Sequence, residues 1–178
     1  MPKIIEDLEK RLLEETRRQI EELGYGAMTV RSVAKGCGVG VGTVYNYFPS
    51  KDVLAATVML EDWQAGLQQL RSRCQHAPSV LHGLRMVYDT IMDFVTLYEK
   101  VWGQYSLQAG IMPFVRARHN QLIGQLEAEI EPLLEQFDCL FYSRLPAFLA
   151  ESLLNAATRP DVTFNDLLPI LQKLCHPE

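Results

Sequence analysis

Apolar side chains recur at three- and four-residue steps along most of this 178-residue chain, and that spacing is typical of helix. The first such segment covers residues 3–23, where Glu, Lys and Arg separate the apolar-face positions Ile5, Leu8, Leu12, Thr16, Ile20 and Leu23. The pattern predicts an amphipathic helix with one face toward a core. Gly24 is expected to end this helix, because glycine readily adopts the left-handed conformation of a helix cap.

Two short helices and a long one are expected next. Thr29 is a good N-cap for the first short helix, which Gly36 and Gly38 are expected to break. The second covers about residues 41–47, and Ser50 is expected to cap the long helix that follows. The helix over residues 3–23 and the two short helices, with a glycine-rich turn between the two short ones, together predict a helix-turn-helix.

The rest of the chain continues as long helical patterns, with a last helix expected over about residues 164–174. The expected breaks lie near residues 77–78, 110–113 and 137–138. No strand-like alternation of useful length and no repeat is present. We therefore predict an all-α fold with an N-terminal helix-turn-helix DNA-binding domain over residues 1–51. A larger helical domain, for ligand binding and dimerisation, is expected over residues 52–178.

The composition favours an ordinary soluble domain, with 48% apolar and 22% charged residues. The longest runs without a charge, residues 36–50 and 101–115, are shorter than the roughly 20 residues of a membrane span. The N-terminus is charged from Lys3 and lacks the apolar run of a secretory signal, so a cytoplasmic location is expected. The cysteines Cys37, Cys74, Cys139 and Cys175 lack zinc-ligand spacing. We expect reduced, structural thiols, no metal and no cofactor.

The net charge of −5 is unevenly distributed along the chain. Residues 1–52 carry as many basic as acidic side chains, so the net negative charge comes entirely from residues 53–178. Between Leu23 and Lys51 the only charged side chains are basic, namely Arg31, Lys35 and Lys51. Because salt screens charges beyond about 10 Å, a local cationic patch can bind phosphate even on a mildly acidic molecule.

The second short helix has the side chains that a DNA-reading helix needs. Such a helix is short, projects beyond its neighbours and carries small or hydrogen-bonding groups that fit the major groove. Predicted base contacts come from Val41, Thr43 and Asn46, with Arg31 as a further reader. Predicted phosphate contacts come from Thr29, Gly42, Tyr45, Tyr47 and Lys51. Val33, Val39, Val44 and Phe48 are expected to pack inward and fix the angle between the two helices.

An ordered pattern without gaps runs through residues 24–54. Its members are Gly24-Tyr25, Thr29-Val30, Val33-Ala34, Gly38-Val39, Gly42-Thr43-Val44-Tyr45, Tyr47-Phe48, Lys51-Asp52 and Leu54. In these residues the chain resembles the tetracycline-repressor (TetR/AcrR) family of bacterial transcription regulators. Two positions depart from the family pattern: Cys37 replaces a usual Ala, and Gly40 replaces a Ser that caps the reading helix and touches a phosphate.

The resemblance implies a homodimer that binds double-stranded DNA at a palindromic operator. It places the dimer contact on the last long helices, and residues 119–137 and 140–154 do carry broad apolar faces. The predicted interface residues are Leu122, Leu126, Ile130, Phe141, Phe148 and Leu149. The same two apolar stripes would also suit an intramolecular core.

The resemblance also implies a ligand cavity in the C-terminal part, whose occupation changes the separation of the two reading heads. The middle of the chain is rich in aromatic residues and methionine, which suits a largely apolar small-molecule effector. The candidate pocket residues are Met92, Phe94, Tyr98, Trp102, Tyr105, Met112 and Phe114. Ordinary core packing is the alternative for each of them.

We therefore predict a ligand-responsive transcription regulator, most simply a repressor, with no membrane partner. Enzyme function is not expected, because no nucleophile or metal motif is present and the glycines of residues 36–42 lack nucleotide-loop spacing. Two alternatives stay open. One is a small-molecule binding or interaction protein with weakened DNA binding, which Gly40 favours, and the other is an activator of the same fold.

Overall fold

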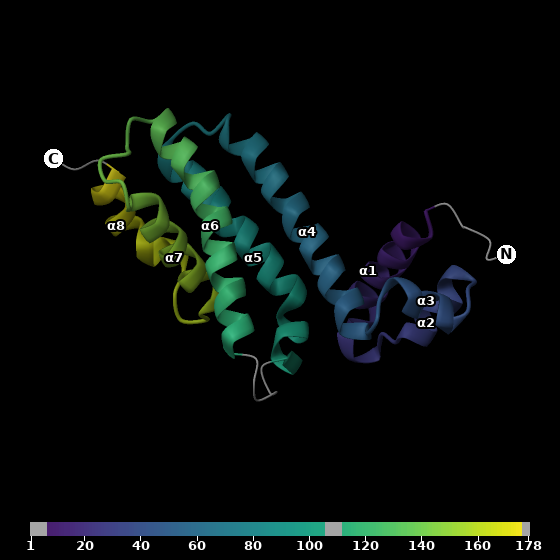
Figure 1. The fold of residues 1–178 in the computed structure, drawn as a ribbon. Coiled ribbons are helices and arrows are strands. Elements are labelled where there is room, and N and C mark those ends of the chain that lie inside the picture. Colours follow the sequence, from purple (N-terminus) through teal and green to yellow (C-terminus); the bar gives the residue numbers. More distant parts are fainter. Residues whose placement is uncertain (1–6, 106–111, 176–178) are drawn as a thin grey trace. The chain divides into compact units, whose positions relative to one another are not determined.

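A computed structural model describes residues 7–105 and 112–175 of the chain. Side chains are described for these residues except for residues 99–118. Within these ranges the chain is all-helical, as predicted (Figure 1). The helices are α1 (Leu8–Ala27), α2 (Val30–Cys37), α3 (Val41–Tyr47), α4 (Lys51–Cys74), α5 (Val80–Tyr105), α6 (Met112–Gln136), α7 (Leu145–Thr158) and α8 (Phe164–Cys175).

The chain divides into two compact units. Unit 1 contains residues 1–64 and 97–105, and unit 2 contains residues 65–96 and 106–178. The predicted division between residues 51 and 52 differs from these limits, because the first half of α4 and the end of α5 pack with α1 rather than with the later helices. As the limit of a DNA-binding function, the division at residue 51 stays a prediction.

The apolar face of α1 forms much of the unit 1 core. Leu8, Leu12, Thr16 and Ile20 are all buried, as their spacing predicts. Leu23, expected on the same face, is instead 57% exposed. It directly precedes Gly24, whose positive φ of 79° interrupts the regular helix, so Leu23 lies at the end of the regular part of α1.

Charged side chains join three segments of unit 1. Arg17 of α1 donates a hydrogen bond of 2.6 Å from Nε to Asp62 of α4, and a second of 2.9 Å from Nη2 to Glu61. The other carboxylate oxygen of Asp62 accepts a hydrogen bond from the hydroxyl of Tyr98 on α5. This network fixes the end of α5 to the first and fourth helices of unit 1.

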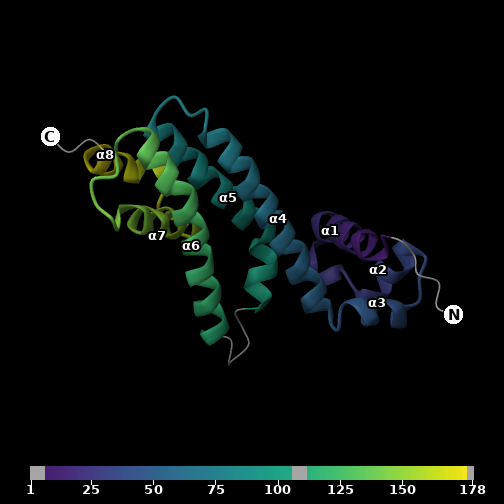
Figure 2. The same cartoon turned by 45° about the horizontal axis from the view of Figure 1, so that its top comes forward.

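Unit 2 is a helical bundle in which α7 packs along α6 and α8 packs against α7 (Figure 2). Leucine and isoleucine side chains of α6 and α7 form a large part of its core, among them Leu126, Ile130, Leu133, Leu134, Leu149 and Leu153. Glu129 is buried beside them, and Arg71 of α4 binds both of its carboxylate oxygens, one of them from Nε at 3.0 Å. Pairing of this kind offsets the cost of removing a carboxylate from water.

The predicted helix over residues 140–154 begins five residues later than expected, at Leu145. Pro146 lies in the first turn, where its missing N–H is not needed, and this favours a helix start there. The break predicted near residues 137–138 is confirmed by Asp138, which has a φ of 54°. The break predicted near residues 110–113 lies mostly outside the described residues.

The four cysteines are free thiols and are buried. Burial raises the pKa of each thiol, that of Cys175 to about 11. These thiols are therefore protonated and unreactive near neutral pH, in keeping with a structural role. Of the helices in the described ranges, none has the length and apolarity to cross a membrane.

Candidate nucleic-acid interface

The N-terminus of α2 is held by the capping box that Thr29 begins. The Thr29 hydroxyl accepts a hydrogen bond of 3.0 Å from the backbone N–H of Ser32, and the Ser32 hydroxyl bonds the backbone N–H of Thr29. The Ser32 hydroxyl also donates to Gln19 of α1 over 2.6 Å. The cap that the sequence predicts at Thr29 is thus confirmed, and it ties α2 to α1.

The turn between α2 and α3 depends on Gly38. This residue has a φ of 67°, a conformation that costs little only for glycine, and its N–H returns to carbonyls at the end of α2. The next amide, of Val39, bonds the carbonyl of Ala34 over 2.9 Å, which completes a glycine-based cap. Gly36, also expected to break the helix, lies inside α2, where an added Cβ would meet the end of the Glu15 side chain.

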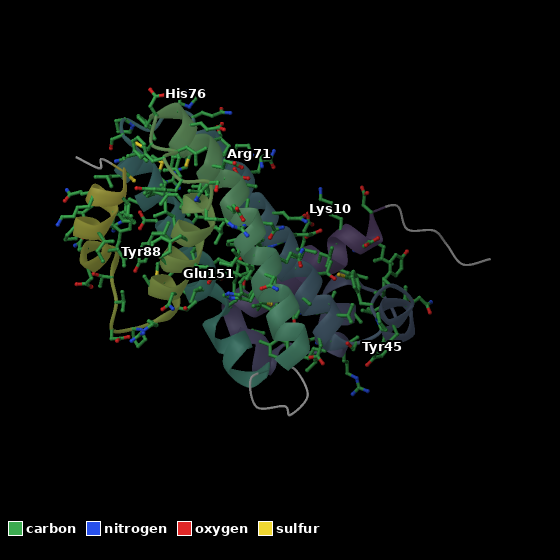
Figure 3. The ribbon with its side chains drawn as sticks, turned by 60° about the vertical axis from the view of Figure 1, so that its left-hand side comes forward. Lys10, Tyr45, Arg71, His76, Tyr88 and Glu151 are labelled. Carbon is green, nitrogen blue, oxygen red and sulfur yellow. The ribbon has the colours of Figure 1, made fainter. Side chains whose placement is uncertain are left out.

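Helix α3 has a buried face and an exposed face. Val44 is fully buried and Phe48 nearly so, which fixes the helix against unit 1. On the outer side Asn46 is exposed, and Tyr45 and Tyr47 are 50% and 41% exposed. Tyr45 is labelled in Figure 3. The predicted inward positions of Val44 and Phe48 are therefore confirmed, and Tyr45, Asn46 and Tyr47 lie on the exposed face.

The remaining predicted contact residues on and before α3 have mixed exposure. Gly42 is exposed, whereas Val41 and Thr43 are half-buried and so present only part of their side chains. Gly40 occupies the N-cap with a φ of −73° and makes no side-chain hydrogen bond there. The first turn of the helix is instead held by a backbone hydrogen bond of 3.0 Å, which the Thr43 amide donates to the Gly40 carbonyl oxygen.

Basic side chains flank α3 on both neighbouring helices. Arg31 and Lys35 are exposed on α2, one helical turn apart. Lys51 lies in the first turn of α4, which Ser50 caps with a bond of 3.1 Å to the Val53 amide. A lysine at the N-terminus of a helix places its positive charge beside the positive end of the helix dipole, and both attract an anion.

The structure assigns partners to Lys51 that the sequence did not predict. Its ammonium lies 4.1 Å from the centre of the Tyr25 ring and 3.4 Å from the carbonyl oxygen of Gly26. Burial is the main reason why its pKa lies below the usual lysine value, and the Asp52 carboxylate opposes that shift. These contacts join residues 25 and 26 positions apart in sequence, so no local pattern could have indicated them.

The predicted pocket residues fall into two groups. Met92 and Phe94 are half-buried on α5, and Tyr98 is 1% exposed with its hydroxyl bonded to Asp62. Tyr98 is thus a core residue of unit 1, and its only polar group already has a protein partner. The side chains of Trp102, Tyr105, Met112 and Phe114 lie outside the described residues.

The predicted dimer residues also divide by exposure. Leu126, Ile130 and Leu149 are fully buried within the single chain, because α6 and α7 pack their apolar stripes against each other. They are core residues and offer no surface to a partner. Leu122 is half-buried, whereas Phe141 and Phe148 are 50% and 54% exposed and remain candidates.

Comparison with known proteins gives two kinds of match. Residues 12–58 match the family of bacterial regulatory proteins called the tetR family. The HTH-type transcriptional regulator UidR of Escherichia coli K12 is 26% identical over 102 residues, or 57% of this chain and 48% of UidR. The chain therefore spans about half the length of these curated relatives.

Solved structures resemble the chain over nearly its whole length. A protein described as a TetR-family transcriptional regulator from Rhodococcus sp. has a TM-score of 0.64 and 13% identity, covering 94% of this chain and 98% of that one. FadR from Bacillus subtilis, solved in complex with stearoyl-CoA, has a TM-score of 0.52 and 18% identity, covering 95% and 98%. At such identities the likeness concerns the fold alone.

The all-helical fold and the exposed face of α3 define a helix-turn-helix protein. The matched segment contains the whole of α2 and α3, together with the parts of α1 and α4 that hold them. Over residues 12–58 the chain is similar to the tetR family of bacterial regulatory proteins.

Proposed function

We propose that the chain is a transcription regulator that binds double-stranded DNA through α2, α3 and the start of α4. The observation that carries the proposal is the division of α3, which buries Val44 and Phe48 and exposes Tyr45, Asn46 and Tyr47. Such a helix can enter the major groove without losing its own support. The flanking cations, with no acidic residue between residues 23 and 51, supply the attraction to phosphate.

Within this proposal, side chains divide into those that read bases and those that hold phosphates. Asn46 is the foremost base reader, because an exposed amide can bond an adenine edge through two atoms. Val41, Thr43 and Arg31 complete the proposed base contacts. The proposed phosphate contacts are Thr29, Gly42, Tyr45, Tyr47 and Lys51, of which Thr29 already uses its hydroxyl as the α2 cap.

We further propose that the chain acts as a homodimer on a palindromic operator and represses transcription. Major-groove readers of this class place two heads about one helical turn of DNA apart, which requires two copies of the chain. We assign the apolar contact between copies to Phe141 and Phe148 of unit 2, which are 50% and 54% exposed and so carry apolar surface that a second copy could cover.

A small-molecule effector is proposed as the signal that releases DNA. The likeness of fold to a protein solved with stearoyl-CoA favours a largely apolar effector. Of the predicted pocket residues, the half-buried Met92 and Phe94 are proposed to contact it. To release DNA, the effector must bind the form that does not fit the operator more tightly than the form that does.

The proposal is tested by selecting bound sequences from a random duplex library, with the affinity of the selected site measured across a salt series. We expect an inverted repeat whose half-sites lie about one helical turn apart. Weak, steeply salt-dependent binding without any enriched sequence would contradict it. That result would favour the alternative, a helical small-molecule binding or interaction protein.

Two substitutions and a control assign the roles. Asn46→Ala should relax specificity at one base pair, whereas Lys51→Ala should weaken binding to every sequence and lower the salt slope by about one. Lys10→Ala removes the same charge from an exposed site on α1, well separated from Tyr45 in Figure 3, and should change neither. If Lys51→Ala behaved like Lys10→Ala, the phosphate assignment of Lys51 would be wrong.

A further inference from the structure

Tyr25 contacts two consecutive residues at the start of α4. It follows the break at Gly24 and is only 8% exposed. Its ring lies under the ammonium of Lys51, 4.1 Å from the nitrogen, and its hydroxyl donates a hydrogen bond to the Asp52 carboxylate. One side chain therefore contacts both Lys51, the first residue of α4 and the proposed phosphate ligand, and Asp52, the second.

The contact with the ring restrains a side chain that is otherwise free to move. A lysine side chain loses conformational freedom whenever its ammonium is fixed on a ligand, and that loss weakens binding. The negative face of an aromatic ring attracts an ammonium and holds it near one position. Because the freedom is lost before the phosphate arrives, less is lost on binding.

The geometry leaves Lys51 able to bind an anion. An ammonium has three N–H donors, and one of them is directed to the Gly26 carbonyl oxygen at 3.4 Å. The ring covers one side of the group without accepting a conventional hydrogen bond. Lys51 stays half-exposed, so a donor remains for a phosphate oxygen. Partial burial also removes some of the water that binding would otherwise have to displace, which agrees with the lowered pKa of this lysine.

We propose that Tyr25 is a positioning residue for DNA binding, which holds the ammonium of Lys51 where it meets a phosphate at the start of α4. The inference rests on the proposed function, because it assumes that Lys51 binds phosphate. It differs from a purely structural role for Tyr25, which would stabilise unit 1 but have no effect on binding that depends on Lys51.

The test is a double-mutant cycle on the full chain with the selected operator duplex. The proteins are the wild type, Tyr25→Leu, Lys51→Ala and the double variant, with Tyr25→Phe to keep the ring and remove only the hydroxyl. We expect Tyr25→Leu to weaken binding about 2- to 5-fold, the range of an exposed cation–π contact, and to weaken it no further once Lys51 is alanine. Tyr25→Phe should keep the wild-type salt slope.

The outcomes separate the two proposals. If Lys51→Ala changes neither affinity nor salt slope, the phosphate assignment within the proposed function fails. If Lys51→Ala weakens binding but Tyr25→Leu causes the same loss with or without Lys51, the positioning role is overturned and Tyr25 is only structural.

A spectroscopic measurement keeps the inference testable if Tyr25→Leu does not fold. In the wild-type protein, the methylene protons next to the Lys51 ammonium should show an upfield ring-current shift from Tyr25 in the NMR spectrum. We expect this shift to persist when the operator duplex is added. Its disappearance on binding would mean that Lys51 leaves the ring to reach the phosphate, and would overturn the proposal.

Discussion

At the residue scale, Gly83 of α5 shows how closely two helices of unit 2 approach. A Cβ at this position would lie 2.4 Å from the Cδ1 atom of Leu133 on α6, far inside van der Waals contact. Leu133 is itself 2% exposed, so it has little room to move. The absence of a side chain at residue 83 therefore allows α5 and α6 to pack.

Gly83→Ala is predicted to destabilise unit 2. Alanine favours helix over glycine by about 1 kcal/mol, but overpacking a core costs about 1–3 kcal/mol. The control is Gly124→Ala on α6, where an added Cβ meets nothing within 4 Å and only the gain in helix propensity remains. In urea unfolding, the Gly83 variant should be less stable than the Gly124 variant by about 1–3 kcal/mol. Equal stabilities would show that Leu133 can move aside without cost.

At the element scale, the end of α5 is attached to unit 1 through Tyr98. Burial, followed by the hydrogen bond and the charge of Asp62, raises the pKa of its hydroxyl above the ordinary value of 10.0. A raised pKa means that the folded state keeps the proton when the unfolded chain has released it. The stabilisation from this hydroxyl is therefore complete below pH 10 and declines as the pH rises above it.

Tyr98→Phe is predicted to remove this alkaline sensitivity. Below pH 10 the variant should be less stable than the wild type by about 1 kcal/mol, because one hydrogen bond is lost while Asp62 keeps its bond with Arg17. Above pH 10 the difference in unfolding free energy should shrink. The measurement is denaturant unfolding from pH 7 to pH 11, and a difference that stays constant over that range would show that the hydroxyl titrates normally.

At the scale of the whole molecule, the proposed dimer depends on the surface of unit 2. Phe148→Glu is predicted to weaken self-association at least tenfold, since it places a charge where an apolar contact is proposed. Leu23→Glu is the matched control, because Leu23 of unit 1 is 57% exposed and Phe148 is 54% exposed. Sedimentation of each variant over a range of concentrations gives the dissociation constant. An unchanged constant for Phe148→Glu would place the contact on another surface.

The sequence by itself determined the helical class and the local form of the helix-turn-helix. Periodicity, the Thr29 cap and the glycine-rich turn depend on neighbours within a few residues, so the starts of α2 and α3 and the inward position of Val44 were predictable. The same holds for the last helix, where a clear apolar stripe follows a loop.

Only the tertiary structure decided which apolar and charged groups meet across the chain. Leu126, Ile130 and Leu149 carry the same pattern whether they face a partner or their own core, and the packing of α6 on α7 buries them within the single chain. The contact of Lys51 with Tyr25 likewise joins distant segments. A periodic pattern specifies which face of a helix is buried, but not against what, because that depends on contacts between residues far apart in sequence.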